Sequence, residues 1–424
     1  MAEVRTRRAF LSLVGAAATA GCSGIPSFAS QPPPVAADPE TDWVQAGRDA
    51  GHAAYVPSAE GAPSEVRWEF GPHEHVSRPV VVGESAYVVA EVPERGLFGH
   101  RKSDTKVVLF RIDPADGTAR RVAATEDRLD GWGTDDFSFH RGRFYLADYG
   151  SLFALDARTG REAWRRDGVS TTARPAAADG LVVLGCYDGV CCFDAETGDR
   201  RWRNPIPPRR AVLDSPAIAD GRVVYVVNDG DTTEPPQSAT VRAVEAETGE
   251  AVWSMETDAV SFGGPVVAGD TAYLANEKYV YALDAATGAR RWRTPISPPD
   301  YLLGTDLCVG PERVFVSENP DDSSGLTALS RADGEREWTL DTRDVCYRAT
   351  RTSDALYVCV SGERNRHVAE DFHAALLSVN PGSGEPYWKY RLRHYAAEPP
   401  VAAGGSLYVT RGLQSGMSLL AFGY

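Results

Sequence analysis

The stretch ALDARTGREAWR (154–165) decides the fold, because closely similar stretches recur along the chain. Close copies are VCCFDAETGDRRWR (190–203), VRAVEAETGEAVWS (241–254) and VYALDAATGARRWR (280–293), and looser copies occupy 109–122, 326–339 and 376–389. Two short, β-rich segments precede the repeated motif, so each unit contains four short strands. Four strands repeated about every 40 residues predict a β-propeller in which each unit forms one blade.

The number of units predicts an all-β, eight-bladed propeller of four-stranded antiparallel blades over residues 42–424. The last unit supplies only three strands, whereas VRWEF (66–70) precedes the first complete unit. We expect this N-terminal strand to complete the last blade, since that pairing closes the ring and removes an exposed sheet edge. Seven blades are the alternative, if the weak first or second unit is absorbed elsewhere. The second-strand signature that gives the count is marked by Tyr87, Tyr145, Leu184, Tyr225, Tyr273, Phe315, Tyr357 and Tyr408.

The repeated glycine and tryptophan predict contacts between blades rather than a ligand site. Glycine permits the tight turn between the third and fourth strands, and Asp156 and Thr159 can hydrogen-bond to the backbone inside it. The indole is a large flat surface that is best buried with its N–H paired, so we expect it to pack against the neighbouring blade. This docking set comprises Trp68, Trp164, Trp202, Trp253, Trp292, Trp338 and Trp388 with Gly160, Gly198, Gly249 and Gly288.

The charged residues are acidic in excess, with 59 Asp and Glu against 44 Lys and Arg and a net charge of −15. The lysines are only Lys102, Lys106, Lys278 and Lys389. This acidic, lysine-poor composition indicates a halophilic, haloarchaeal source; the alternative is a GC-rich genome, which alone could replace Lys by Arg. Nothing in the sequence resembles a basic groove, which argues against a nucleic-acid partner.

The N-terminus predicts export and lipid anchoring. TRRAFLS (6–12) contains Arg7 and Arg8, and a short apolar run follows it as far as residue 20. This arrangement resembles a twin-arginine signal peptide over residues 1–21, and TAGC (19–22) resembles a lipobox with Cys22 as the lipidated residue. Residues 22–41 then form a Pro-rich spacer. We expect an extracytoplasmic protein held at the outer face of the cytoplasmic membrane by its lipid anchor alone.

One face of the predicted ring is elaborated, and loops on such a face carry function. The connections 91–106, 229–240 and 361–373 are long, whereas the D-x-x-T-G turns at the other face are short and uniform. Histidines gather on the elaborated face; we interpret them as solvated loop residues, with a zinc or copper site as the alternative. These histidines are His73, His75, His100, His367, His373 and His394.

Charged residues of both signs lie near the mouth of the predicted central channel, where the innermost strands begin. Arginines there can hold an anionic ligand by bidentate contacts. The alternative, which we favour, is that the charges pair with one another across the channel. The residues of this candidate ligand site are Arg78, Arg174, Asp214, Asp306, Arg348 and Glu398.

The cysteines allow two cross-strand disulfides, since an exported protein can form them. A two-residue hairpin turn at Asp188-Gly189 places Cys186 directly opposite Cys191. A tight turn at Thr352-Ser353 places Cys346 opposite Cys359. Cys192 and Cys308 are then expected to be buried as small hydrophobic residues.

The repeat resembles the tryptophan-docking motif of the quinoprotein family, the PQQ-like β-propellers. The resemblance covers residues 42–424, and DWVQAGRDAGHAAY (42–55) looks like the lead-in of such proteins. It implies either a non-catalytic, BamB-like assembly scaffold or an alcohol dehydrogenase that uses PQQ and calcium. No catalytic residue of the dehydrogenases can be placed here by motif. The adjacent Cys191–Cys192 pair resembles the one beside PQQ in some of them, but it lies in a third strand and not over the channel.

We therefore predict a non-catalytic scaffold that binds other proteins through its elaborated face and needs no cofactor. A PQQ- and calcium-dependent dehydrogenase and a surface sensor for a small ligand or metal are the alternatives.

Overall fold

The computed structural model describes residues 37–38, 41–45, 47–57, 65–95, 101–124, 137–147, 150–169, 171, 173–207, 210–212, 214–229, 238–261, 263–297, 307–318, 325–342, 345–361, 374–392, 398–413 and 416–423. Arg7, Arg8, Cys22, His100, Asp306, His367, His373 and His394 lie outside these ranges. No helix within them is long and apolar enough to span a membrane.

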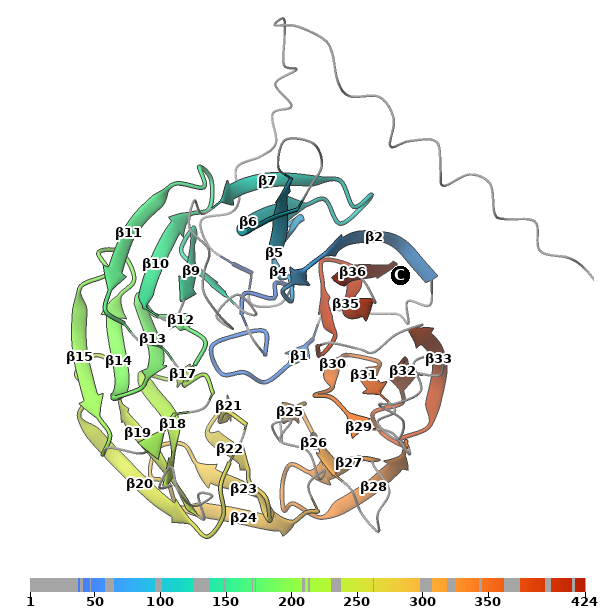
Figure 1. Cartoon of the computed structure of the whole chain (residues 1–424). Helices are drawn as coiled ribbons and strands as arrows, with labels where there is room; N and C mark the ends of the chain where they lie inside the picture. The colour runs from blue at the N-terminus through green and yellow to red at the C-terminus, as the bar shows by residue number, and fades with distance from the viewer. Residues whose placement is uncertain are drawn as a thin grey trace, which may run out of the picture. The chain divides into compact units, whose positions relative to one another are not determined.

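Eight antiparallel sheets follow one another around a ring, which confirms the eight-bladed propeller (Figure 1). Blade 1 contains β4 (Val80–Val82), β5 (Ser85–Arg95), β6 (Arg101–Ile112) and β7 (Ala119–Ala124). Blade 2 contains β8 (Ser138–His140), β9 (Arg143–Ala147), β10 (Ser151–Asp156) and β11 (Glu162–Asp167). Blade 3 contains β12 (Ala176–Ala178), β13 (Leu181–Cys186), β14 (Gly189–Asp194) and β15 (Arg200–Pro205). Blade 4 contains β17 (Ala217–Ala219), β18 (Arg222–Asp229), β19 (Ser238–Glu245) and β20 (Ala251–Thr257).

The second half of the ring repeats this order. Blade 5 contains β21 (Val266–Ala268), β22 (Thr271–Ala275), β23 (Tyr279–Asp284) and β24 (Arg290–Pro295). Blade 6 contains β25 (Cys308–Val309), β26 (Arg313–Glu318), β27 (Gly325–Ser330) and β28 (Arg336–Asp341). Blade 7 contains β30 (Thr350–Thr352), β31 (Leu356–Ser361), β32 (Ala374–Val379) and β33 (Pro386–Leu392). Short strands β3 (His75–Val76), β16 (Arg210–Ala211) and β29 (Val345–Cys346) pair with the second strands of blades 1, 4 and 7.

The ring closes through the N-terminal strand, as predicted. Blade 8 contains β34 (Val401–Ala403), β35 (Ser406–Leu413) and β36 (Gly416–Gly423), and its outer strand is β2 (Glu65–His73). β2 and β36 run antiparallel, with Trp68 opposite Ala421. The last blade is therefore built from segments far apart in the sequence, and β2 covers the edge that β36 would otherwise leave open.

Six of the seven docking tryptophans lie over the turn glycine of the next blade, and Trp388 is the exception because β36 and β2 of blade 8 are not joined by such a turn. In blade 2 the Trp164 indole N–H donates to the Ala195 carbonyl of blade 3 (3.1 Å). A Cβ on Gly198 would lie 2.5 Å from Trp164 Cδ2, and Gly198 has φ +73°, so no other residue fits there without strain. The same contact joins Trp68 to Gly117, Trp202 to Gly249, Trp253 to Gly288, Trp292 to Gly334 and Trp338 to Gly384.

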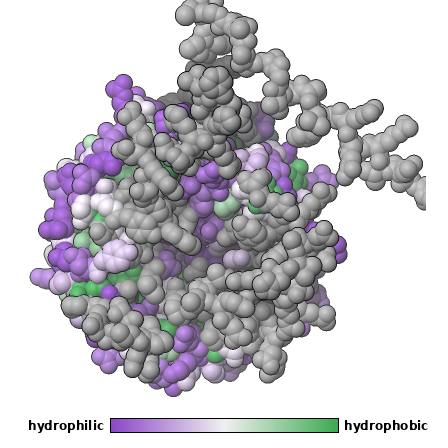
Figure 2. Space-filling model, in the orientation of Figure 1, coloured by the Kyte–Doolittle hydropathy of each residue, from purple (hydrophilic) through white to green (hydrophobic). Residues whose placement is uncertain are grey.

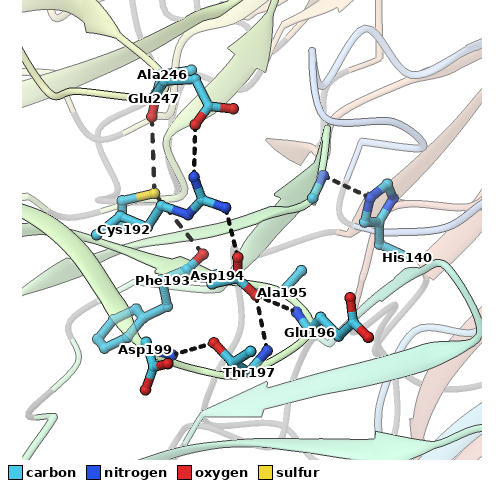
Figure 3. A network of polar contacts seen from close by, with 12 residues as sticks. His140, Cys192, Phe193, Asp194, Ala195, Glu196, Thr197, Asp199, Ala246 and Glu247 are labelled. Carbon is cyan, nitrogen blue, oxygen red and sulfur yellow. Dashed lines mark hydrogen bonds and ion pairs between the residues drawn. The ribbon is translucent and has the colours of Figure 1, made fainter.

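The D-x-x-T-G turn is held by its own aspartate. In blade 3 the Asp194 carboxylate accepts N–H hydrogen bonds from Glu196 and Thr197, each 2.9 Å long (Figure 3). Arg201 bridges Asp194 (2.6 Å) to Glu247 of blade 4 (2.9 Å). The repeat therefore stabilises the turn and connects adjacent blades. Around the rim of the propeller, most of the coloured surface in Figure 2 is hydrophilic.

Candidate functional site

An axial segment, defined as residues 41–57, lies in the centre of the ring with β1 (Tyr55–Val56) near its end (Figure 1). Its backbone, and one side chain, hydrogen-bond to the innermost strands of blades 1 to 7 in turn. The contacts are Val81 N–H to Trp43 O (2.7 Å), Phe139 to Val44 O (2.7 Å), Ala177 to Gln45 Oε1 (2.9 Å), Ile218 to Ala50 O (2.7 Å), Val267 to Gly51 O (2.7 Å), Val309 to Ala53 O (2.8 Å) and Arg351 to Ala54 O (2.9 Å).

The path of the axial segment depends on unusual backbone conformations. Arg48, His52 and Ala54 all have positive φ values, at 85°, 63° and 54°. A Cβ at Gly51 would lie 2.3 Å from the Val267 carbonyl oxygen, so only glycine allows this close approach. Such strain persists where the surroundings over-determine the backbone, and the hydrogen bonds to seven blades do so here.

His52 is one of three buried ionisable groups of this segment, with 5% of its surface exposed; Asp42 and Arg48 are the others. Its Nε2 lies 3.1 Å from the Pro216 carbonyl. A carbonyl only accepts, so Nε2 carries the proton and donates it. Burial lowers the pKa of His52, while Asp214 raises it and Arg348 lowers it further. The lowered pKa keeps the imidazole neutral at neutral pH, and the two charged residues that act on it, Asp214 and Arg348, both belong to the predicted channel-mouth site.

The described residues of the predicted channel-mouth site connect neighbouring blades. Arg78 of blade 1 and Glu398 of blade 8 form an ion pair (Nε to Oε2, 3.5 Å). Asp214 accepts the N–H of Ser215 (2.7 Å) and, across to blade 5, the N–H of Gly264 (2.9 Å). Both carboxylates thus already have partners at the blade junctions.

The other two described members lie at equivalent positions before their inner strands. Arg348 is 8% exposed and acts on His52. The Arg174 carbonyl accepts the Ser215 hydroxyl (3.0 Å). The anionic-ligand role of this cluster stays a prediction.

Two histidines of the predicted cluster, His73 and His75, lie within the described residues, and neither belongs to a group of potential metal ligands. His73 packs on Phe70 and Phe110, with ring centroids 4.7 and 5.8 Å away, and burial lowers its pKa. His75 lies opposite Glu91 in the β3–β5 pair. Among the described residues, no group of three or more His, Cys, Asp or Glu could hold a metal. The metal alternative therefore rests on histidines outside the described ranges.

The predicted strand registers of the cysteine pairs are wrong, and the six described cysteines are free thiols. Cys186 lies opposite Gly189, and Cys191 lies opposite Leu184, because the turn is Tyr187-Asp188. Gly189 belongs to β14, where a Cβ would lie 2.2 Å from the Asn204 carbonyl.

The second pair has a comparable shift. Cys346 lies opposite Val360, and the Tyr347 N–H donates to the Cys359 carbonyl (2.9 Å). The turn is at Ser353-Asp354, where the Thr352 N–H donates to the Ala355 carbonyl (2.9 Å). The register changes between this turn and β29, so Cys346 pairs with Val360, one residue beyond the predicted partner Cys359.

Sequence reasoning missed the axial segment and His52. The lead-in at 42–55 was the available signal, but its residues have no strand or helix periodicity. The segment's partners are also spread over more than 250 residues of sequence, from Val81 to Arg351.

Comparison with known proteins places the chain among PQQ-like propellers. Residues 148–234 and 237–369 match the family model described as "Outer membrane protein assembly factor BamB". The assembly factor BamB of Burkholderia pseudomallei is 29% identical over 158 residues, which is 35% of this chain and 39% of that protein. Quinohemoprotein alcohol dehydrogenase ADH-IIG of Pseudomonas putida is 24% identical over 264 residues, 57% of this chain and 29% of that protein. The chain thus matches about two-fifths or less of each relative's length.

Solved structures give the same fold. The Pseudomonas putida ADHIIG structure superposes with a TM-score of 0.71 at 17% identity, covering 93% of this chain and 83% of that one. BamB from Moraxella catarrhalis superposes with a TM-score of 0.57 at 14% identity, covering 86% of this chain and 98% of that one. At these identities the likeness extends to the fold alone.

Proposed function

The chain belongs to the family described as "Outer membrane protein assembly factor BamB", and we propose that it is a non-catalytic propeller scaffold that binds other proteins outside the cytoplasm. The observation that carries this proposal is the axial segment. It occupies the centre of the ring and hydrogen-bonds to the inner strands of seven blades. A rigid ring whose axis is filled by its own chain offers its loops and rim, rather than a central cavity, to a partner.

The long hairpins supply a surface for that partner. β5 and β6 span 11 and 12 residues, whereas the matching strands of blade 2 span 5 and 6. Their connection lies at the end of the strands opposite to the D-x-x-T-G turns, because successive antiparallel strands turn at alternate ends. The elaborated face therefore differs from blade to blade, as a specific binding surface requires.

The described residues of the channel mouth do not fit PQQ with calcium. Calcium takes about six to eight oxygen ligands. Asp214 already accepts two backbone N–H groups, and Glu398 faces Arg78. No described cluster of carboxylates is left to form the calcium shell. This mismatch supports the scaffold over the dehydrogenase, although both occur among the chain's relatives.

Cross-linking of intact cells tests the scaffold directly. We expect the wild-type protein to cross-link to other proteins, and we expect a variant with residues 93–105 replaced by a two-residue turn to lose most of that product while its thermal unfolding stays within a few degrees. Glu196→Lys, a single charge reversal on the uniform face, is the matched control and should cross-link normally. Recovery of the wild-type protein alone would contradict the proposal.

A titration with PQQ and calcium provides the opposing test. We expect no saturable quenching of tryptophan fluorescence up to millimolar PQQ and no dye-linked alcohol oxidation. Saturable binding with turnover would replace the scaffold by the dehydrogenase.

Lipid anchoring is the second part of the proposal and rests on the TAGC motif (19–22), which ends at Cys22. Cys22→Ser should move the protein from the membrane fraction to the medium, since it removes the acceptor thiol without touching the export motif. Arg7→Lys with Arg8→Lys should instead keep the protein inside the cell. Immunoblots of fractionated cells distinguish the two, and a Cys22→Ser protein that stays with the membrane would contradict the anchor.

A further inference from the structure

A cavity of about 510 Å³ lies between blades 2 and 3, away from the axial segment. Residues at the end of β11, the β13–β14 hairpin and β15 line it. This volume is within the range of small-molecule sites, roughly 300–1,000 Å³. The lining combines two thiols, Cys186 and Cys191, with three guanidinium groups, those of Arg166, Arg200 and Arg203.

The two thiols form a polarised pair. Cys191 lies opposite Leu184, two residues before Cys186, so both side chains project from the same face of the sheet. They pack in the apolar cluster shared with blade 2 and are 3% and 5% exposed. A hydrogen bond with Cys186 lowers the pKa of Cys191, and the same contact raises the pKa of Cys186. Cys191 is therefore the more acidic thiol of the pair.

The charges around the pair favour an anion. Burial and Asp188 raise the pKa of Cys191, whereas Arg203 and Arg200 lower it. Arg203 is bound to Asp188, whereas no described carboxylate forms an ion pair with Arg200, whose side chain is exposed. Together with Arg166 and Asp167, the lining has three cationic and two anionic side chains. A thiol pair at the wall of a pocket with one more cationic than anionic side chain resembles the environment of a reactive cysteine, in which a nearby positive charge favours the thiolate.

We propose that this cavity is a thiol–disulfide exchange site for a small, negatively charged disulfide. Cys191 gives up its proton, and its thiolate attacks one sulfur of the disulfide, forms a mixed disulfide with it and expels the other half as a thiolate, which takes up that proton. Cys186 then gives up its proton and attacks the Cys191 sulfur, which closes the Cys186–Cys191 bond and releases the second half. The protein loses two electrons and two protons, and the small disulfide becomes two thiols.

Cys192 provides an internal control one residue along the same strand. Its sulfur lies 4.0 Å from the Ala246 carbonyl of blade 4, on the opposite face of the sheet (Figure 3). Burial raises the pKa of Cys192 to about 12. It is neither a thiolate at neutral pH nor part of the cavity lining.

Reaction of the purified, reduced protein with glutathione disulfide tests the site. We expect loss of two thiols and a peptide map that joins Cys186 to Cys191. Cys186→Ser should trap glutathione on Cys191, whereas Cys191→Ser should leave Cys186 at least roughly tenfold slower, since the thiolate is the nucleophile. Cys192→Ala should react like the wild type.

Disulfides of opposite charge test whether the arginines select an anionic substrate or whether the thiols are merely accessible to any disulfide. In low salt, glutathione disulfide should react roughly tenfold faster than cationic cystamine, and this preference should shrink as salt screens the arginines. Equal rates for both probes would overturn the anionic specificity. Absence of any adduct or Cys186–Cys191 link, under conditions where the unfolded protein reacts at all its thiols, would overturn the site itself.

Discussion

Trp202→Ala will lower the free energy of unfolding by about 3–5 kcal/mol, the usual cost of removing a large buried aromatic side chain. The Trp202 indole lies over Gly249 of blade 4, where a glycine Cβ would be only 2.8 Å from Cδ2. Its N–H donates to the Ala246 carbonyl (2.7 Å). The truncation leaves a void between two blades and an unpaired buried carbonyl, which adds to the loss. Urea unfolding followed by circular dichroism measures the change.

Trp388→Ala is the matched control, and we expect at most half of that loss. Trp388 occupies the same place in blade 7, but its indole N–H has no hydrogen-bond partner. The third and fourth strands of blade 8 are β36 and β2, so no D-x-x-T-G turn joins them under this indole. Equal losses for the two variants would mean that the neighbouring turn contributes nothing, contrary to the docking argument.

The fold was predictable because its determinants are local and repeated. The turn glycine, the aspartate that caps it and the tryptophan four residues after the glycine all act within one blade and its neighbour. The count of second-strand signatures then sets the number of blades. Even the long-range closure by β2 was predictable, because the last unit lacks a fourth strand and one unassigned strand precedes the first complete unit.

The channel was not predictable in the same way. The sequence placed Arg78, Asp214 and Glu398 near its mouth, and the structure puts each against another blade. Nothing local in the sequence indicates that Gly51 and its neighbours would fill the axis. Those contacts join one short segment to strands spread along the chain, and their geometry depends on positive φ values at non-glycine residues such as His52.

The register of the β13–β14 hairpin was also predicted wrongly, and the cause is Gly189. Asp188-Gly189 has the composition of a hairpin turn, but Gly189 is needed in β14, where β15 approaches too closely for a side chain. The turn therefore forms one residue earlier. The shift leaves Cys186 and Cys191 on one face as diagonal neighbours, which is the arrangement that gives the cavity its thiol pair.

Acidification from pH 6.5 to 4 will lower the free energy of unfolding by about 1–2 kcal/mol through His140 alone. The His140 Nε2 accepts the Gly180 N–H across the junction of blades 2 and 3 (3.0 Å; Figure 3). Burial, then Arg141, lowers its pKa from 6.5 to about 4, while Asp179 acts in the opposite direction. Below pH 6.5 the imidazole is protonated in the unfolded chain but stays neutral in the folded protein. The free energy of unfolding therefore falls as the pH falls, and the loss is complete only below the folded pKa of about 4. The side chain is only half-buried, which reduces the effect from the full shift.

His140→Gln isolates this contribution, because the amide oxygen can accept the same N–H and does not titrate. At pH 7.5 the variant should differ from the wild type by about 1 kcal/mol or less, the net worth of one hydrogen bond. Between pH 6.5 and 4 its urea midpoint should fall less steeply than that of the wild type. His52, whose pKa burial also lowers, keeps part of the acid sensitivity in both proteins. Identical slopes would mean that His140 takes up its proton without breaking the blade contact, and the neutral imidazole would then have no part in joining blades 2 and 3.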